Sequence, residues 1–244
     1  MPPRRPDSLP PRAHTALILF AKRPFPGRVK TRLARAIGAE SAAALAEAFL
    51  RDGAARWSAM PGCAPVVAAD APDDPFWESV FPAPWRIEPQ GEGDLGARLS
   101  RAFARELGRF PRAAAIGADH PSLPSVETGA FLREENAIWP ARDGGYAAIL
   151  LSRGAAERLA VDGAPAAFLF EEIAWSTPRV LAQTVARAES RGVTLTRFPD
   201  TDDVDVPADL DRLARELASR DRSSPDFPSR TWEVLRSIRT EARA

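Results

Sequence analysis

Short apolar segments alternate with longer helix-forming segments along residues 16–219 of this chain. An apolar run bounded by breakers, such as Ala16–Phe20, is typical of a strand buried on both faces of a parallel sheet. The predicted strands are Ala16–Phe20, Pro65–Ala69, Trp85–Ile87, Ala113–Gly117, Ala137–Trp139, Tyr146–Leu151 and Val193–Arg197, and the predicted helices are Ala39–Trp57, Leu95–Leu107, Val126–Glu135, Pro178–Arg191 and Ala208–Ser219. This alternation predicts an α/β fold in three αβα layers, with a mostly parallel sheet between the helices.

A length of 244 residues allows one large domain with a substantial core, which we expect at residues 14–219. Residues 1–13 combine five prolines with three arginines and can bury little apolar surface, so they predict a disordered tail. Residues 220–244 predict a polar linker followed by a last helix, Thr231–Arg243, which packs on the domain or on a partner.

The charge balance bears on the kind of partner. Lys plus Arg and Asp plus Glu number 33 each, which argues against general nucleic-acid binding and favours a local anion site for a small molecule. No apolar stretch is long enough to span a bilayer, so no membrane is expected. A single cysteine, Cys63, allows no internal disulfide and favours a cytoplasmic location. The oligomeric state is left open.

A basic loop follows the first predicted strand, and its five cations surround Gly27: Lys22, Arg23, Arg28, Lys30 and Arg32. In open α/β sheets, ligands bind beyond the carboxyl ends of the strands. The loop therefore predicts a phosphate site, most simply for a nucleotide. The alternative is that these side chains are ordinary solvated surface residues.

Two acidic residues follow other strands of the predicted sheet. Asp119 comes just after Ala113–Gly117, and Asp205 follows Val193–Arg197 in a dense acidic loop. Hard cations prefer oxygen ligands and often bind through one or two carboxylates plus substrate phosphates, so both residues are candidate ligands for Mg²⁺ or Mn²⁺. Alternatively, Asp119 caps a turn before Pro121. Asp209 is interpreted as a structural residue at the start of a helix.

Two glycine-rich segments are further candidates. Asp143-Gly144-Gly145 precedes a strand, where glycines often mark a close approach to a ligand and Asp143 could accept hydrogen bonds from a hydroxylated substrate; a plain hairpin turn is the alternative. Gln90–Arg98 could contact a nucleobase through Gln90 and backbone groups, with Gly96 beside it, or form a surface loop.

Several chemistries are excluded by missing patterns. The chain has no complete Walker motif, no G-x-G-x-x-G after a strand and no G-x-S-x-G elbow. Two histidines and one cysteine cannot make a histidine-rich or thiolate zinc site.

Five motifs occur in the order of one known family. They are F-A-K-x-P-x-P-G-x-V-K-T-R-L (Phe20–Leu33), G-A-D-x-P-x-L (Gly117–Leu123), D-G-G-Y (Asp143–Tyr146), L-F-x-x-I-x-W-S-T (Leu169–Thr177) and D-V-D-x-P-x-D-L (Asp203–Leu210). Over about Leu17–Leu213 the chain resembles the glycosyltransferase-A-like proteins called "transferase 1, radical-SAM/selenodomain-associated", formerly a domain of unknown function. His120 and Val206 depart from the residues usual in that pattern.

The first and last motifs are also similar to nucleotidyltransferases of the same nucleotide-diphospho-sugar transferase fold, including 2-phospholactate and molybdenum-cofactor guanylyltransferases. The resemblance places the metal on Asp119 and Asp205, which match the two metal-binding acids of those classes.

The resemblance implies transfer of a sugar from a nucleotide-sugar donor to a small acceptor. Lys22, Lys30 and Arg32 would neutralise phosphates, with Gly27 in their loop. Catalytic roles fall on Asp119, Lys30 and Asp143, and Gly144, Gly145 and Trp175 would line the sugar or acceptor pocket. The alternatives are a nucleotidyltransferase that uses a nucleoside triphosphate, and a non-catalytic nucleotide-binding protein.

Overall fold

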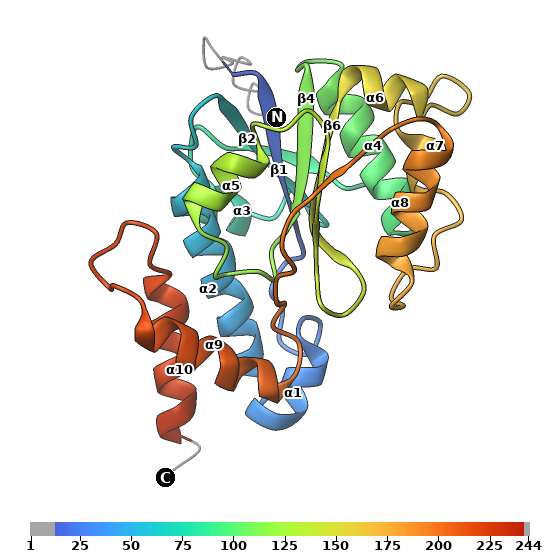
Figure 1. Ribbon diagram of the computed structural model, residues 1–244. Coiled ribbons are helices and arrows are strands. Elements are labelled where there is room, and N and C mark those ends of the chain that lie inside the picture. Colours follow the sequence, from blue (N-terminus) through green and yellow to red (C-terminus); the bar gives the residue numbers. More distant parts are fainter. Residues whose placement is uncertain (1–12, 242–244) are drawn as a thin grey trace.

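The computed structural model describes residues 13–241, and its centre is one seven-stranded sheet in the order β3-β2-β1-β4-β6-β5-β7 (Figure 1). The strands are β1 (Thr15–Ala21), β2 (Cys63–Ala69), β3 (Arg86–Pro89), β4 (Arg112–Gly117), β5 (Ala137–Pro140), β6 (Tyr146–Ser152) and β7 (Thr196–Arg197). Among these strands β6 alone runs opposite to the others, since it pairs antiparallel with both β4 and β5. The predicted mostly parallel sheet of an α/β fold is confirmed.

Helices cover both faces of the sheet, as the three-layer prediction requires (Figure 1). They are α1 (Thr31–Ile37), α2 (Ala39–Trp57), α3 (Phe76–Val80), α4 (Leu95–Leu107), α5 (Ser125–Phe131), α6 (Arg153–Arg158), α7 (Ala167–Phe170), α8 (Val180–Ser190), α9 (Pro207–Ser219) and α10 (Ser229–Glu241). In β1, Leu17 and Leu19 join the core beneath α2, α3 and α5, while Ala16 and Ile18 join the core beneath α4, α6, α7 and α8. This alternation follows from the two-residue period of a strand.

A third apolar cluster lies beyond the sheet and joins α1, α2, α9 and α10 (Figure 1). Leu33 and Leu45 meet Leu213 and Leu217 of α9 there, and Leu235 of α10 packs against the same cluster. Of the two possibilities open for the C-terminal helix, the structure shows packing on the domain.

The element boundaries differ from the prediction where helices are short. Helix α5 ends at Phe131 rather than Glu135, and α8 begins at Val180 rather than at Pro178. Helices α1, α3, α6 and α7 were not predicted, because fewer than two full turns give little periodic signal. The last predicted strand shrinks to Thr196–Arg197. The predicted tail at residues 1–13 lies, apart from Ala13, outside the described residues.

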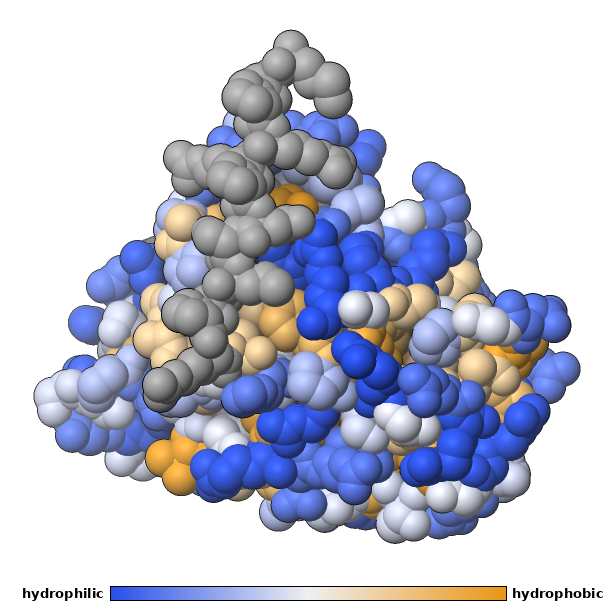
Figure 2. Space-filling view, turned by 90° about the horizontal axis from the view of Figure 1, so that it is seen from above, coloured by the Kyte–Doolittle hydropathy of each residue, from blue (hydrophilic) through white to orange (hydrophobic). Residues whose placement is uncertain are grey.

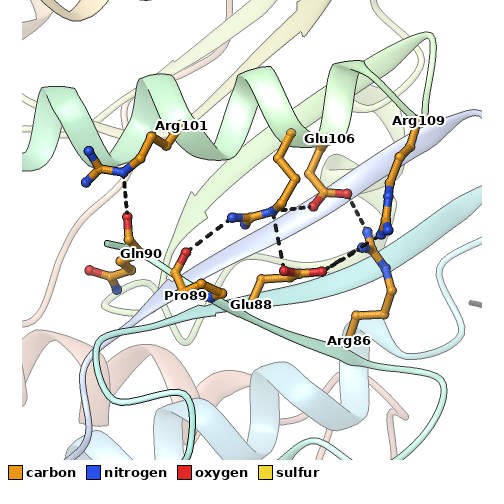
Figure 3. A network of polar contacts seen from close by, with 8 residues as sticks. Arg86, Glu88, Pro89, Gln90, Arg101, Glu106 and Arg109 are labelled. Atoms are coloured by element: carbon orange, nitrogen blue, oxygen red, sulfur yellow. Dashed lines mark hydrogen bonds and ion pairs between the residues drawn. The ribbon is translucent and has the colours of Figure 1, made fainter. Parts of the chain in front are cut away.

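The edge strand β3 is fixed to α4 by charged side chains (Figure 3). Glu106 of α4 is fully buried and pairs with both Arg86 and Arg105, and Glu88 of β3 contacts the same two arginines. Beside this network, Arg105 donates to the carbonyl of Pro89 and Arg101 donates to the carbonyl of Gln90. The network fixes the loop that follows β3.

Figure 2 shows the molecule from the end at which β1 begins. This end is mostly hydrophilic, with small separate apolar areas. Within residues 13–241, none of the helices combines the length and apolarity needed to cross a bilayer.

Candidate active site

The sheet topology brings five connecting segments to one edge. Strands β1, β3 and β4 end at this edge, and the antiparallel strand β6 begins there. The segments concerned are the basic loop 22–30, the glycine-rich loop 90–94, the loop 118–124, the turn 141–145 and the acidic loop 198–206. This is the carboxyl edge at which open α/β sheets bind their ligands.

Lys30 joins two of these segments. Its backbone adopts the left-handed conformation, with φ 46°, directly before α1. Its side chain is 4% exposed, and Nζ lies 2.6 Å from Oδ1 of Asp119 and 3.0 Å from Oδ1 of Asp205. The left-handed region is uncommon for a residue other than glycine, and such strain concentrates at functional sites.

The Lys30 ammonium and the two carboxylates stabilise one another's charged forms. Burial alone would lower the pKa of Lys30, but the charges of Asp119 and Asp205 outweigh burial and raise it. Partial burial of Asp119 opposes its ionisation, yet the neighbouring Lys30 holds the Asp119 pKa below its usual value. The side chains of Asp119 and Asp205 remain 54% and 43% exposed, so solvent reaches both of them. The site is therefore an ion triad open to a ligand.

A further acid, Asp203, lies near the ion triad. Burial and the nearby charges of Asp205 and Asp143 raise the pKa of Asp203 to about 6. Asp203 was not among the predicted site residues. The signal that could have found it is its spacing of two from Asp205, since residues two apart point the same way in an extended segment.

The position of Asp205 is fixed by the start of α9. The carboxylate of Asp209 accepts the backbone N–H groups of Asp205 and Val206 at 2.8 Å each, and it pairs with Arg212. This supports the structural interpretation of Asp209.

His120 connects the loop after β4 to the acidic loop. Its ring is buried, and Nδ1 donates to the carbonyl of Asp202 at 3.1 Å. Burial lowers the pKa of His120. His120 was noted in the sequence only as a departure from the family pattern, and here it is a neutral link that holds the two loops together.

The cations of the basic loop have different surroundings. Arg23 pairs with Asp74 at 3.0 Å and lies between the rings of Phe25 and Phe76, so it anchors the loop. Lys22, Arg28 and Arg32 are exposed, and the charge of Lys22 reaches Asp119. Gly27, at φ 76°, makes the turn between them.

The segment Asp143-Gly144-Gly145 forms the tight turn between β5 and β6. Gly145 N–H donates to Oδ1 of Asp143, and Ala141 and Gly145 close the turn through their backbones. A Cβ on Gly144 would lie 2.3 Å from the carbonyl oxygen of Pro178. The glycine at this position therefore lets the backbone of Pro178 come close, rather than a ligand. Asp143 is exposed beside the acidic loop.

Three predicted residues lie apart from the ion triad. The amide of Gln90 is buried, donates to the carbonyls of Ala21 and Ala68, and accepts from Arg98. A Cβ on Gly96 would meet Phe170 O at 2.3 Å and the Trp175 indole nitrogen at 3.0 Å. In this structure, therefore, Gln90 ties strand ends together, while Gly96 and Trp175 pack α4 against the segment after α7.

The donor set suits a hard cation. Because the two carboxylate oxygens contact one nitrogen at 2.6 Å and 3.0 Å, they lie no more than 5.6 Å apart, close to the roughly 5 Å that two metal–oxygen bonds of up to about 2.6 Å can span. Within residues 13–241 there is no group of three or more His, Cys, Asp or Glu side chains arranged to hold a metal ion. A cation that arrives with nucleotide phosphates often binds through one or two carboxylates, so two protein ligands would be enough for it.

Comparison with known proteins agrees with this architecture. Residues 54–177 match a family described as "Uncharacterized protein conserved in bacteria (DUF2064)". No curated protein matches the chain. A solved structure from Desulfovibrio desulfuricans G20, described as a "putative nucleotide-diphospho-sugar transferase", is 25% identical over 95% of this chain and 97% of that chain, with a TM-score of 0.81.

Two more distant structures share the fold alone. One is a 4-diphosphocytidyl-2C-methyl-D-erythritol synthase, with 14% identity, coverage of 82% of this chain and 96% of that chain, and a TM-score of 0.51. The other is a cytidylyltransferase from Leptospira borgpetersenii serovar Hardjo-bovis (strain JB197), with 11% identity, coverage of 95% and 96%, and a TM-score of 0.50. The fold is thus one that nucleotide-diphospho-sugar transferases and cytidylyltransferases use.

Proposed function

The chain belongs to the DUF2064 family, and within that family we propose that it transfers a sugar from a nucleotide-sugar donor to a small acceptor. The narrower assignment to the radical-SAM/selenodomain-associated transferases is part of this proposal. The observation that carries it is the ion triad at the carboxyl edge of the sheet, in which Lys30 lies between Asp119 and Asp205.

The residues of the site divide the work on a nucleotide diphosphate. Lys22 and Arg32 are exposed, one on each side of Lys30 in the chain, and can approach phosphate oxygens from solvent. Lys30 supplies a buried cation whose interaction with phosphate is strong because little water surrounds it. A divalent cation held by Asp119 and Asp205 would stabilise the diphosphate as it leaves.

The acceptor end of the site would include the turn between β5 and β6. Asp143 is exposed there and keeps one carboxylate oxygen beyond the contact with Gly145. That oxygen can accept a hydrogen bond from a hydroxyl of the sugar or the acceptor. In the transfer, the bond between the sugar carbon and the diphosphate oxygen would break, the oxygen of an acceptor hydroxyl would bond to that carbon, and the hydroxyl proton would pass to a nearby carboxylate or to water.

Binding is tested first, by thermal shift with nucleoside di- and triphosphates and nucleotide-sugars, with and without Mn²⁺. A ligand at about one hundred times its Kd stabilises the folded state by about 2.7 kcal/mol. Asp119→Asn should remove the Mn²⁺-dependent part of the shift. The matched control is Asp211→Asn, since Asp211 is an exposed carboxylate of α9, and it should leave the shift unchanged.

Product analysis separates the possible chemistries. Glycosyl transfer releases a nucleoside diphosphate, or a monophosphate from a monophosphate-sugar donor. Pyrophosphate release from a nucleoside triphosphate, with a phosphate compound as acceptor, would instead establish a nucleotidyltransferase. In that case the same basic side chains would bind the triphosphate. Nucleotide binding without turnover in any combination would indicate a non-catalytic binding protein.

A further inference from the structure

The segment between α9 and α10 contacts the loop that carries Asp119. Arg220, at the end of α9, donates to the carbonyl of Ser122 at 3.3 Å. Arg56 of α2 lies beside it and donates to the carbonyls of Leu123 at 2.6 Å and Pro121 at 2.8 Å. Three successive carbonyls after His120 are thus held by two guanidinium groups.

Asp226 closes the arrangement from the other side. Its carboxylate accepts the N–H of Ser125 at 3.3 Å and the hydroxyl of Ser125 at 2.5 Å, at the start of α5. Its carbonyl accepts from both Arg56, at 3.2 Å, and Arg220, at 3.5 Å. The loop 118–124 is therefore held at its middle by arginines and at its end by Asp226.

The two neighbouring guanidinium groups of Arg56 and Arg220 repel each other electrostatically. Burial and the neighbouring charge of Arg220 lower the pKa of Arg56 to about 10. The shared carbonyl of Asp226 and the loop carbonyls offset that repulsion. The loop that these groups hold also carries Asp119, whose side chain is half exposed.

Helix α9 connects both carboxylates of the triad. Asp205 lies two positions before its first residue, Pro207, and Arg220 lies just after its last, Ser219. Beyond this segment, α10 is fixed because Asp52 of α2 accepts the N–H groups of Arg230, at 3.2 Å, and Thr231, at 2.8 Å. The C-terminal part of the chain thus ties the positions of Asp119 and Asp205 to one rigid helix.

We propose that residues 220–227, here called the brace, position Asp119 against Lys30, with Arg220 and Asp226 as positioning residues. Residues 220–227 lie beyond residues 54–177, which match the family. The importance of this positioning for activity rests on the proposed function, but the positioning itself can be measured without any ligand.

The chain supplies its own probe, because Lys22 and Lys30 are its only lysines. Lys22 is exposed, whereas Lys30 is buried against Asp119. Labelling with an amine-reactive reagent, followed by peptide mass spectrometry, gives the ratio of Lys30 to Lys22 modification. In the unaltered chain, this ratio should be well below one.

Arg220→Ala should raise the ratio about tenfold, the change expected when hydrogen bonds from a charged group are lost. The matched control is Arg215→Ala, because Arg215 is an exposed arginine of α9 close to Arg220 in the chain, and it should leave the ratio unchanged. Labelling is repeated at low urea concentrations. If Lys30 becomes accessible through local opening of the loop, the labelling ratio should hardly depend on urea. If Lys30 becomes accessible only when the whole chain unfolds, the ratio should rise steeply with urea.

A second pair of variants covers the case in which Arg220→Ala does not fold. Ser125→Ala removes the hydroxyl that Asp226 accepts, and Ser125→Thr restores it. The brace predicts a raised ratio for the first and a nearly normal ratio for the second. Equal ratios in the two Ser125 variants, or an increase in Arg220→Ala that depends steeply on urea, would overturn the proposal.

Nucleotide titration then separates the two proposals. If the unaltered chain binds a nucleotide with Mn²⁺, Arg220→Ala should weaken that binding several-fold while Arg215→Ala does not; unchanged binding despite faster Lys30 labelling would refute a role in positioning the site. If the unaltered chain binds no nucleotide, the proposed function fails, and the labelling ratio alone decides whether the brace holds Asp119.

Discussion

Lys30 and Asp205 are 175 positions apart in the sequence, yet their side chains meet at 3.0 Å at the edge of the sheet. The same ammonium contacts Asp119, and it lies near the ring of Phe49. Lys30 therefore neutralises the two carboxylates that would hold a divalent cation. An ammonium and a cation that seek the same oxygens must compete for them.

Replacing Lys30 with Met tests this competition. Without the ammonium, Asp119 and Asp205 lose their counter-charge, so Mn²⁺ alone should bind more tightly. Nucleotide should bind more weakly, by about ten- to a hundredfold, because a charged hydrogen bond contributes about 1.5–3 kcal/mol. Electron paramagnetic resonance measures free Mn²⁺ in the first titration, and calorimetry follows the second.

The matched control is Lys22→Met. Lys22 is exposed, and its charge lowers the pKa of Asp119, but no ion pair joins the two side chains within the described part of the chain. The affinity for Mn²⁺ should therefore change much less in Lys22→Met than in Lys30→Met. Weaker binding of Mn²⁺ in Lys30→Met would show that Lys30 does not compete with the cation.

The sequence predicts the long elements well, and it predicts that Asp119 and Asp205 lie close together. Helices Ala39–Trp57 and Leu95–Leu107 have the predicted ends, because several turns of apolar periodicity define them. Asp119 and Asp205 were expected to converge because both follow strands that run in the same direction, and the structure brings them together on Lys30.

What the sequence could not predict depends on contacts between distant residues. The place of Lys30 between two acids requires a left-handed backbone that nothing in the local sequence demands. Gln90–Arg98 was open to two interpretations from the sequence, a nucleobase contact or a surface loop, and neither reveals that the buried amide of Gln90 donates to the carbonyls of Ala21 and Ala68. The partner of Asp226 lies 101 positions away, at Ser125, which local patterns do not reveal.

Gly144→Ala should destabilise the fold. At φ 89°, an alanine is strained, and its Cβ would lie 2.3 Å from Pro178 O and 2.5 Å from Pro178 Cα. We expect a loss of about 2–3 kcal/mol, measured by urea unfolding. Gly154 of α6 is the control, because a Cβ there meets nothing within 4 Å, and Gly154→Ala should stabilise by about 0.4–1 kcal/mol. A neutral effect of Gly144→Ala would mean that the turn shifts easily.

Cys63 makes stability depend on alkaline pH. Burial raises the pKa of its thiol from 9.0 to about 11. Above pH 9 the unfolded chain loses this proton first, so the stabilisation present below pH 9 is lost as the pH rises through the folded pKa. At about pH 10.5 the loss should be about 2 kcal/mol. Cys63→Ala lacks this proton, so the decline in its urea-unfolding free energy between pH 8 and 10.5 should be smaller by that amount; equal declines would contradict the assignment.

Arg32 should bind phosphate through a contact that salt weakens, in contrast to Lys30. Arg32 is exposed in the first turn of α1, and interactions of exposed charges are screened within about 10 Å at 0.1 M salt, whereas buried pairs are screened much less. Arg32→Ala should therefore lower nucleotide affinity about three- to fivefold at low salt, since exposed pairs contribute up to about 1 kcal/mol. The difference should almost vanish at 0.5 M salt, while the loss in Lys30→Met persists. Arg35→Ala, an exposed arginine in the last turn of the same helix, controls for net charge. If Arg32→Ala and Arg35→Ala lower affinity equally in calorimetric titrations, the basic loop attracts nucleotide only through its overall charge, and Arg32 has no place in the site.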